Sequence, residues 1–224
     1  MRIVIRIGGS VVASPIDPSL ISKYVALLTD LKAQGHEVAV VVGGGTLARE
    51  FIKVAKNLGL DENAQDEVAI SVSRIFVQLF LKKLGRLGCE AVPLTVEDAV
   101  NCLRSGKVAV MGGLKPGMTT DTVAALIAEK VNADLLIKAT DQNGIYNKDP
   151  RKHADAVLLK HLSFEELPTV FAEDRHKAGI HQILDPEAVK ILKRKRVRVV
   201  VVNGFKTGNV LAVVDGKRVG TLID

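Results

Sequence analysis

Glycine-rich and polar loops follow several predicted strands of this 224-residue chain, and their residue types suit the binding of negative charge. The most distinctive is Gly43-Gly44-Gly45, which lies between the β-branched run 37–42 and a predicted helix that Thr46 is expected to cap. Glycine lets a ligand approach the backbone with no Cβ in the way, and the N–H groups and positive dipole end of a following helix attract anions. A simple strand-to-helix turn, the alternative, normally needs a single glycine. The three glycines therefore favour an anion site.

Three further loops also follow directly after predicted strands. They are Gly8 to Ser10, Gly112 to Asp121 and Thr140 to Asp149. Because open α/β sheets bind ligands at the carboxyl edge of parallel strands, we expect all four loops to meet there. One anion needs one loop, whereas two phosphorylated ligands meeting head to head would use four, with backbone N–H groups and cations to offset their repulsion. The chemistry indicated is phosphoryl transfer.

Two common nucleotide-binding motifs are absent from the sequence. No G-x-x-x-x-G-K-[ST] loop occurs, which excludes a P-loop kinase, and no G-x-G-x-x-G follows a strand, which disfavours a dinucleotide dehydrogenase. The two cysteines, Cys89 and Cys102, form no C-x-x-C pair and are too few for a four-ligand zinc site. We expect both to be buried thiols without a functional role.

The composition is that of a globular protein, with 47% hydrophobic and 25% charged residues. No apolar run approaches the length of a bilayer span and no signal-peptide pattern opens the chain, so we expect a cytoplasmic protein with no membrane partner. The net charge of +6 suits an anionic ligand and would also suit a nucleic acid. However, the basic cluster 190–198 lies at a predicted helix end and aromatic residues are only 4%, so we expect no nucleic-acid partner.

Alternating strands and helices must position the loops, and their order predicts parallel strands joined by right-handed crossovers within one domain. The predicted strands are 3–7, 37–42, 90–94, 108–111, 134–138 and 197–202. The predicted helices are 20–31, 46–58, 62–84, one capped by Thr95, one after Asp121 and one opened by Asp185-Pro186. A capping box is predicted at Ser163 to Glu166, and a hairpin of 210–214 and 218–223 is expected to close the chain.

Four segments stand in a fixed order along the chain and carry a family resemblance. They are Gly8-Gly9-Ser10 after a strand, Val41 to Arg49, Met111 to Asp121 with its Thr-Thr-Asp, and Lys138 to Pro150. Any one glycine loop is weak evidence for a family, but four such loops in this order and spacing are strong evidence. Together they resemble the amino acid kinase family and, within it, the archaeal-type uridylate (UMP) kinases. The resemblance covers nearly the whole chain, down to the final Gly220-Thr221-Leu222-Ile223.

The resemblance implies a fold, an activity and an assembly. The implied fold is a three-layer α/β/α sandwich on a mainly parallel sheet, with one kinase domain over residues 1–224. The implied activity is reversible transfer of the ATP γ-phosphoryl group to UMP, giving UDP and ADP in pyrimidine nucleotide biosynthesis. The donor is ATP with Mg²⁺, and no metal site of the protein's own is implied. The implied assembly is a homohexamer, a trimer of dimers, with UMP and oligomer contacts mainly in the N-terminal part and the ATP site mainly in the C-terminal part.

The resemblance also implies the residues of the site. Arg6 and Asp121 are the implied catalytic residues, and Asp121 matches the family's aspartate that orients groups around the transferring phosphoryl. The residues implied to bind ATP are Gly9, Ser10, Gly45, Arg49, Thr140, Asp141, Tyr146 and Asp149. The residues implied to bind UMP are Gly44, Asp66, Leu114, Lys115, Pro116, Gly117, Met118, Thr119 and Thr120. The hydroxyls of Thr119 and Thr120 can read polar edges of the base.

Arg6 departs from the family pattern, in which many relatives have lysine. Because Ile5 and Ile7 should face the opposite way, the Arg6 side chain can lie over the same carboxyl edge as the glycine loops. The alternative is a surface arginine on an edge strand. If Arg6 is not the functional cation, Lys138 and Arg49 are the next candidates. Asp141, Asn143 and Met118 also differ from the residues common in relatives.

Two other functions remain open at the level of sequence. One is a kinase of the same family for carbamate, acetylglutamate or isopentenyl phosphate, although such acceptors offer Thr119 and Thr120 no base edge. The other is a non-catalytic nucleotide- or anion-binding protein.

The predicted helix 62–84 has a wide apolar surface. Whatever the function, this surface predicts a homo-oligomer that uses the helix as its dimer contact.

Overall fold

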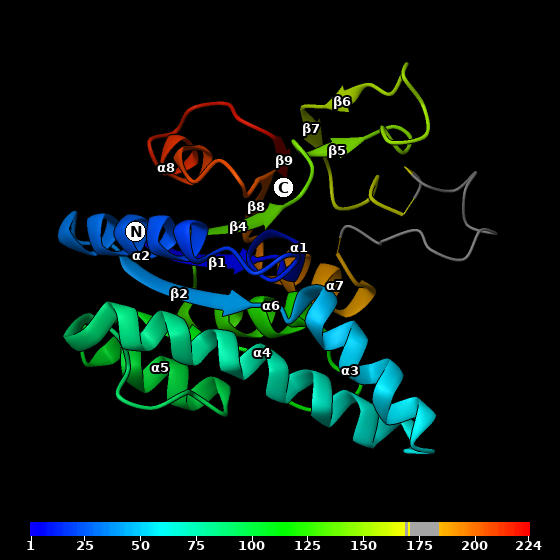
Figure 1. The fold of residues 1–224 in the computed structure, drawn as a ribbon. Helices are drawn as coiled ribbons and strands as arrows, with labels where there is room; N and C mark the ends of the chain where they lie inside the picture. Colours follow the sequence, from blue (N-terminus) through cyan, green and yellow to red (C-terminus); the bar gives the residue numbers. More distant parts are fainter. Residues whose placement is uncertain (169, 171–183) are drawn as a thin grey trace.

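The computed structural model describes residues 1–168, 170 and 184–224, and its centre is a seven-stranded sheet (Figure 1). The strand order is β3-β2-β1-β4-β8-β9-β7. These strands are β1 (Arg2–Ile7), β2 (Glu37–Val42), β3 (Ala109–Met111), β4 (Leu135–Thr140), β7 (His161–Leu162), β8 (Arg198–Asn203) and β9 (Thr221–Ile223). All neighbours pair in parallel except β8 and β9. The expected mainly parallel sheet is thus confirmed.

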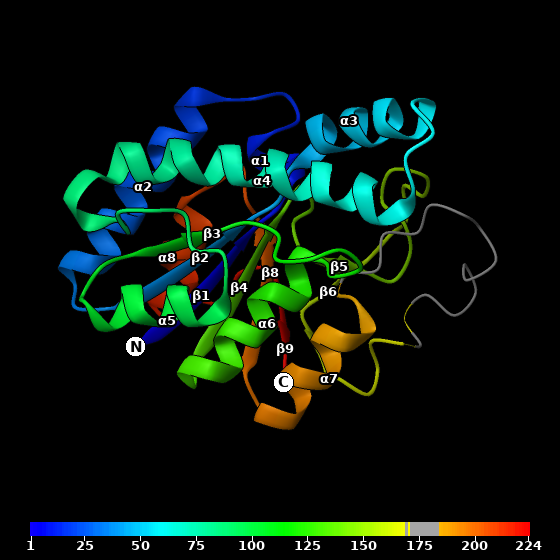
Figure 2. The ribbon, with the colours of Figure 1, turned by 90° about the horizontal axis from the view of Figure 1, so that it is seen from below.

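Helices cover both faces of this sheet and complete the expected three layers. They are α1 (Gly9–Val12), α2 (Pro18–Ala33), α3 (Gly45–Asn57), α4 (Glu62–Leu84), α5 (Val96–Arg104), α6 (Thr120–Val131), α7 (Pro186–Lys195) and α8 (Gly208–Val214), with a 3₁₀ turn, η1 (Gly85–Leu87). Helices α5, α6 and α7 lie over one face in Figure 2, and α2 and α8 lie on the other. Because helices flank both faces, β1, β2, β4 and β8 are almost entirely buried and read as runs of Val, Ile and Leu.

Two predicted elements at the periphery are wrong. Residues 210–214 belong to α8 rather than to a hairpin, since Val210 and Val213 are both buried at helical spacing, and this packing overrides their β propensity. Residues 90–94 form no strand, and Pro93 in this segment lacks the N–H that a central strand would need. The other predicted strands and helices are present, as are the capping bonds between Ser163 and Glu166. No helix of the described residues is long and apolar enough to span a membrane.

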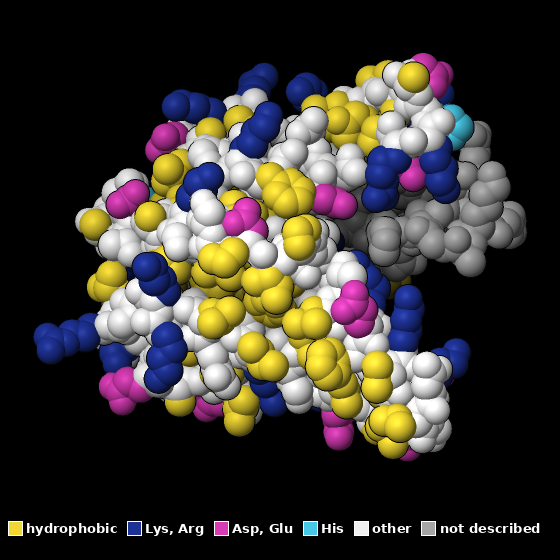
Figure 3. All heavy atoms as spheres, in the orientation of Figure 1, with side chains coloured by type: hydrophobic (Ala, Val, Ile, Leu, Met, Phe, Trp, Pro, Cys, Tyr) yellow, Lys and Arg dark blue, Asp and Glu magenta, His cyan; other side chains and the backbone are white. Residues whose placement is uncertain are grey.

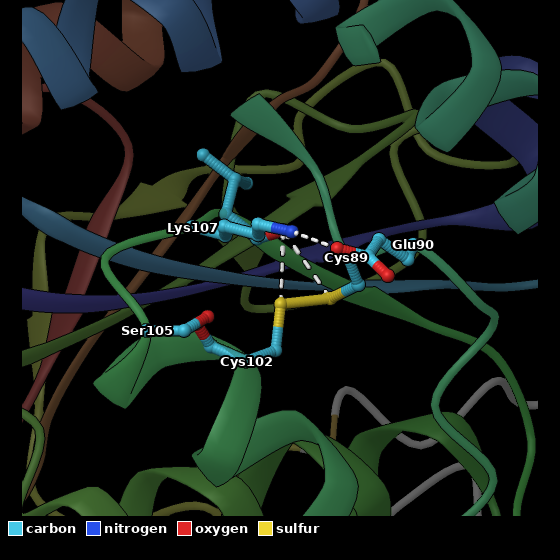
Figure 4. Close-up of a disulfide and its surroundings, with 6 residues drawn as sticks. Cys89, Glu90, Cys102, Ser105 and Lys107 are labelled. Carbon is cyan, nitrogen blue, oxygen red and sulfur yellow. Dashed lines mark hydrogen bonds and ion pairs between the residues drawn. A yellow bond between two sulfur atoms is a disulfide. The ribbon is translucent and has the colours of Figure 1, made fainter. Parts of the chain in front are cut away.

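The expectation that Cys89 and Cys102 are free thiols is also wrong. They are buried as expected, but they form a disulfide whose Cα atoms lie 5.7 Å apart (Figure 4). The bridge joins the segment after η1 to α5, and its two sulfurs lie 3.5 and 3.6 Å from the carbonyl oxygen of Val108. Val108 immediately precedes β3, so the disulfide lies at the amino end of that strand. The fold brings the two cysteines within bridging distance, which their spacing in sequence could not establish.

The basic residues at the end of α7 are paired with carboxylates of neighbouring segments. Arg194 Nη2 lies 2.7 Å and Lys195 Nζ lies 3.8 Å from Glu129 Oε1 on α6. Lys193 Nζ lies 2.6 Å from Glu165 Oε1. These pairs are exposed, so this cluster is the solvated helix end that the sequence indicated.

Candidate functional site

A cleft of about 830 Å³ opens at the carboxyl edge of the sheet, where the four loops meet. Nearly all of the predicted site residues line it. They are Arg6, Gly9, Ser10, Gly44, Gly45, Arg49, Asp66, Lys115, Gly117, Met118, Thr119, Thr120, Asp121, Thr140, Asp141, Tyr146 and Asp149. Leu114 and Pro116 belong to the same loop as Lys115 but do not line the cleft, and Leu114 packs against the core instead. The expectation of four loops converging at one edge is confirmed.

The first two glycine loops pack against each other so closely that side chains are excluded. A Cβ at Gly9 would lie 2.0 Å from the backbone nitrogen of Gly45, and Gly45 itself has a φ of 61°. Ser14 joins the loops: its hydroxyl donates to the Gly9 carbonyl at 3.2 Å and accepts from the Thr46 N–H at 2.7 Å. Helix α3 therefore begins at Gly45 without a side-chain cap, and the predicted capping role of Thr46 is wrong.

Three charged side chains form a buried charge cluster where these loops meet α6. Asp121, in the first turn of α6, lies between Arg6 on β1 and Lys138 on β4. Its Oδ1 is 2.9 Å from Arg6 Nε and its Oδ2 is 2.7 Å from Lys138 Nζ, and the three side chains are between 8 and 17% exposed. Arg6 and Lys138 are register partners on adjacent strands, so their side chains share the face that α6 covers. The fold thus holds two cations on one carboxylate.

The electrostatics of this cluster depend on the burial of its members. Burial lowers the pKa of Lys138, Asp121 raises it, and the neighbouring Arg6 lowers it further. Ions buried in this way cost several kcal/mol each unless they are paired, and such clusters are over-represented at functional sites. Because β1 lies between β2 and β4, Arg6 is not a surface residue on an edge strand, and that alternative is wrong.

One half of the cleft is formed by the loop 112–119 lying on α4. The carboxylate of Asp66 accepts the Gly117 N–H at 2.7 Å, and Ser73 Oγ accepts the Gly113 N–H at 2.9 Å. Arg74 donates to the carbonyls of Gly113 and Leu114 at 3.3 and 3.2 Å. The loop is therefore fixed by four hydrogen bonds from one helix. Sequence reasoning had singled out Asp66 but neither Ser73 nor Arg74, which look like ordinary polar positions of an amphipathic helix.

The two threonines before Asp121 make different bonds. The Thr119 hydroxyl accepts the N–H of Thr122 at 3.1 Å and donates to Asp185 Oδ2 at 2.5 Å. Asp185 also accepts from the Thr122 hydroxyl at 2.7 Å; burial raises its pKa, but these hydrogen bonds hold the pKa below its usual value. Thr120 instead accepts from Arg6 Nη2 at 2.9 Å, which leaves its own proton available. Thr120 is therefore better placed than Thr119 to donate a hydrogen bond to the polar edge of a base.

The other half of the cleft is formed by the segment 140–152, with the short strands β5 (Ile145–Tyr146) and β6 (Leu158–Leu159). Its charges form an exposed ion-pair cluster made up of Asp141, Lys148, Asp149, Arg151 and Asp155. Arg151 Nε lies 3.3 Å from Asp149 Oδ1, and its Nη1 lies 3.9 Å from Asp141 Oδ2. A backbone hydrogen bond from Arg151 lowers the pKa of Asp149. These side chains are 27 to 78% exposed, in contrast to the buried charge cluster.

Comparison with known proteins gives matches over the whole chain. A model of the amino acid kinase family matches residues 1–203. The uridylate kinase of Methanocaldococcus jannaschii is 40% identical over all of both chains, and that of Methanobrevibacter smithii is 37% identical over 100% of this chain and 99% of its own. The crystal structure of uridylate kinase from Archaeoglobus fulgidus has a TM-score of 0.89 at 34% identity, again over all of both chains. The similarity therefore includes both halves of the cleft.

Proposed function

This chain belongs to the amino acid kinase family, and we propose that it transfers the γ-phosphoryl group of ATP to UMP, giving UDP and ADP. The observation that carries the proposal is the buried charge cluster, which lies where all four loops of the cleft meet. Cations in such a place offset the repulsion between two phosphorylated ligands and the charge on the transferring group. The uridylate kinase relatives support UMP as the acceptor. The reaction would serve pyrimidine nucleotide biosynthesis.

We assign the acceptor to the half of the cleft formed by α4 and the loop 112–119. Gly44, Asp66 and the residues 114–120 would surround UMP, with Thr120 donating to the uracil edge. The exposed side chain of Lys115 is free to adjust on binding, the half-buried Met118 packs against the core, and the backbone of the loop is tied to α4. A fixed backbone with an adjustable side chain suits a site that must close around a small nucleotide.

We assign ATP to the other half of the cleft. Gly9, Ser10, Gly45 and Arg49 would contact its phosphates, and Thr140, Asp141, Tyr146 and Asp149 its nucleoside. The close packing of Gly9 on Gly45 leaves bare backbone toward the cleft, which lets phosphate oxygens approach main-chain N–H groups. The chain would thus act as one kinase domain, with the acceptor mainly in its N-terminal part and the donor mainly in its C-terminal part.

Arg6 and Asp121 would act on the transferring group itself. The guanidinium of Arg6 is a planar fork that can hold two phosphoryl oxygens at once. Asp121 holds this fork through Nε, and Thr120 holds it through Nη2, so that its direction is set before substrates bind. A cation fixed in advance stabilises charge as it develops, without reorganisation at the moment of reaction.

Mg²⁺ would enter the cleft as part of the ATP substrate. Among the residues that the structure describes, no three His, Cys, Asp or Glu side chains are grouped to hold a metal ion. Both oxygens of Asp121 are already engaged by cations. The side chains of the cleft therefore fit a Mg²⁺ ion that the ATP phosphates themselves would hold. The ion would neutralise part of the charge of these phosphates. ATP and UMP are cytoplasmic metabolites, and we place the enzyme in the cytoplasm.

The proposed assembly is a homohexamer built from dimers, and its dimer contact is the apolar face of α3 and α4. Figure 3 shows hydrophobic side chains gathered over these two helices. They are Phe51, Val54, Leu58, Leu60, Ile75 and Leu79, between 41 and 73% exposed. Contiguous apolar surface of this kind is typical of subunit interfaces. Sedimentation at micromolar concentration should show an oligomer that Leu79→Glu dissociates, whereas the matched control Val157→Glu should leave it intact; a wild-type monomer would contradict the assembly.

The proposed reaction is tested by the choice of acceptor. Purified protein is incubated with Mg-ATP and, separately, UMP, CMP, dTMP, carbamate, acetylglutamate and isopentenyl phosphate, and ADP release is followed. We expect turnover with UMP to exceed that with every other acceptor. Equal or lower turnover with UMP would reject the proposal. Binding of ATP without ADP release for any acceptor would favour the non-catalytic alternative.

A further inference from the structure

Strand β9 begins at Thr221, and neither Thr221 nor Gly220 before it lines the cleft. Gly220 has a φ of 74°, and a Cβ there would lie 2.0 Å from the carbonyl oxygen of Val201 on β8. Glycine therefore lets the chain approach β8 closely enough for β9 to pair with it. The strand placed in this way carries Thr221, which is fully buried. A buried hydroxyl costs free energy unless it is hydrogen-bonded, so its partners indicate what it does.

The hydroxyl of Thr221 joins β9 to both strands of the two-stranded ribbon formed by β5 and β6, which lies beside β9 (Figure 1). Its oxygen accepts the N–H of Ile145 on β5 at 2.8 Å, and its proton is donated to the carbonyl oxygen of Leu159 on β6. Ile145 and Leu159 are register partners, so the hydroxyl contacts both strands at the same level. Gly144 packs on this hydroxyl as well, since a Cβ there would lie 2.6 Å from Thr221 Oγ1. One buried group thus fixes the ribbon on the main sheet.

The ribbon carries part of the ATP half of the cleft. Gly144, Ile145 and Tyr146 line the cleft, and Tyr146 directly follows the residue whose N–H Thr221 accepts. A two-stranded ribbon is only marginally stable by itself. The buried side chain of Ile145 anchors it in the core, but apolar packing is non-directional, whereas a hydrogen bond limits both distance and angle. The hydroxyl therefore sets the direction in which Tyr146 enters the cleft.

A second polar contact to the same segment comes from the end of β8. Asn203 Nδ2 donates to Asn143 Oδ1 at 2.9 Å, in an exposed position. Water can replace either partner of this bond, whereas a buried group that loses its partner stays unsatisfied. The bonds of Thr221 therefore constrain the segment more strongly than the bond of Asn203.

We propose that Thr221 is a positioning residue for ATP, which holds the ribbon of β5 and β6 so that Tyr146 meets the nucleoside. The proposal rests on the proposed function, which places ATP in this half of the cleft. Thr221 touches neither substrate and acts only through the ribbon. Loss of its hydroxyl should weaken the binding of ATP and leave that of UMP unchanged, because the loop 112–119 is held by α4 instead.

A merely structural role of the hydroxyl predicts a different result. If it only stabilises β9, Thr221→Val should lower the free energy of unfolding without changing the affinity of the folded protein for either substrate. Urea unfolding measures the first quantity, and calorimetric titration measures the second. Thr221→Ser and Thr221→Ala both lack the methyl group and differ only in the hydroxyl. This second pair isolates the two hydrogen bonds even where Thr221→Val does not fold.

The experiment titrates Mg-ATP alone, and UMP alone, into wild type and the three variants. Thr29→Val is the matched control, since the Thr29 hydroxyl donates to the Val25 carbonyl within α2 and does not line the cleft. We expect Thr221→Val and Thr221→Ala to raise the Kd for ATP roughly tenfold, while the Kd for UMP stays within about twofold of wild type. Thr221→Ser and the control should bind both nucleotides as wild type does. The KM for ATP in ADP release should follow the Kd.

The outcomes separate the role of Thr221 from the kinase function. A Kd for ATP within about twofold of wild type in a folded variant that lacks the hydroxyl overturns the role of Thr221. An equal loss of UMP affinity, or a loss of ATP affinity in Thr221→Ser as large as in Thr221→Ala, also overturns it. A wild type that binds ATP but does not turn over UMP rejects the kinase function, and the Kd values for ATP still decide the role of Thr221. A wild type that does not bind ATP overturns both.

Discussion

Two groups of charged side chains line the same cleft and differ mainly in burial. In the buried charge cluster, Asp121 holds Arg6 and Lys138 at 2.9 and 2.7 Å, with side chains 8 to 17% exposed. In the exposed ion-pair cluster, Arg151 lies 3.3 and 3.9 Å from Asp149 and Asp141, with side chains 27 to 60% exposed. The same pairing of carboxylate and cation is therefore present in two dielectric environments.

The difference shows which charges can govern the reaction rate. Where water is excluded, an ion is expensive to leave unpaired and acts strongly on a neighbouring charge. Where water is present, side-chain entropy and screening by salt reduce the free energy of the same interaction to a small fraction of what it is in a buried pair. We therefore expect substitutions in the buried charge cluster to change turnover, and those in the exposed ion-pair cluster to change nucleotide affinity slightly.

The largest effect is expected for Asp121→Asn. This change leaves two buried cations without their shared anion, so we expect turnover to fall a hundredfold or more, equivalent to about 2.7 kcal/mol. It should also cost about 3 kcal/mol in free energy of unfolding, since removing one partner of a buried pair exposes the others to repulsion. Steady-state kinetics and urea unfolding measure the two effects. Unchanged turnover would count against a role of Asp121 in orienting the cations.

A comparable loss of stability is expected at a place remote from both clusters. The Cys89–Cys102 disulfide spans 13 residues, and a cross-link of this loop length contributes about 3 kcal/mol by restricting the unfolded chain. The double variant Cys89→Ser/Cys102→Ser should therefore unfold at lower urea concentration while its kcat stays near that of wild type. Comparison of this double variant with Asp121→Asn separates a loss of stability from a loss of turnover. If kcat falls as far as in Asp121→Asn, the effect of Asp121→Asn on turnover could come from instability alone.

Arg6→Ala should have the next largest effect. Its guanidinium is one of two cations in the buried charge cluster, so we expect at least a tenfold fall in kcat, about 1.4 kcal/mol, with a smaller change in the KM for UMP. Arg6→Lys should recover part of the rate, because it restores the charge but not the fork. If Arg6→Ala changes kcat and both KM values by less than about twofold, or about 0.4 kcal/mol, the cation that matters lies elsewhere.

Much of the cleft could be predicted from sequence because its backbone is encoded locally. Buried strands read as Val and Ile runs, and the loops that follow them need glycine wherever two backbones meet, as at Gly9 and Gly45. The order of these loops was sufficient to predict a shared edge, and the structure confirms it. The position of β1 between β2 and β4 excludes the alternative of a surface arginine on an edge strand, which the sequence context of Arg6 left open.

What the sequence could not predict depends on residues that are distant along the chain. The bond of Thr119 to Asp185 joins residues 66 apart, and no local pattern announces it. The disulfide needs two cysteines at bridging distance, which follows from the packing of α5 on β3. Helix α8 has residues that favour a strand, and its burial against β8 decides the outcome.

The smallest effect is expected in the exposed ion-pair cluster, for Arg151→Gln. Arg151 is 60% exposed, and its bonds to Asp149 and Asp141 compete with water, so its removal should leave kcat unchanged and raise the KM for ATP by no more than about threefold. Because exposed charges are screened by salt, the difference from wild type should vanish near about 0.5 M KCl, whereas the defect of Arg6→Ala should persist there. ADP release measured at low and high salt for both variants tests this directly. If Arg151→Gln lowers kcat tenfold at either salt concentration, Arg151 reaches the transferring phosphoryl group when substrates bind, and burial in the free protein does not decide which charges control the rate.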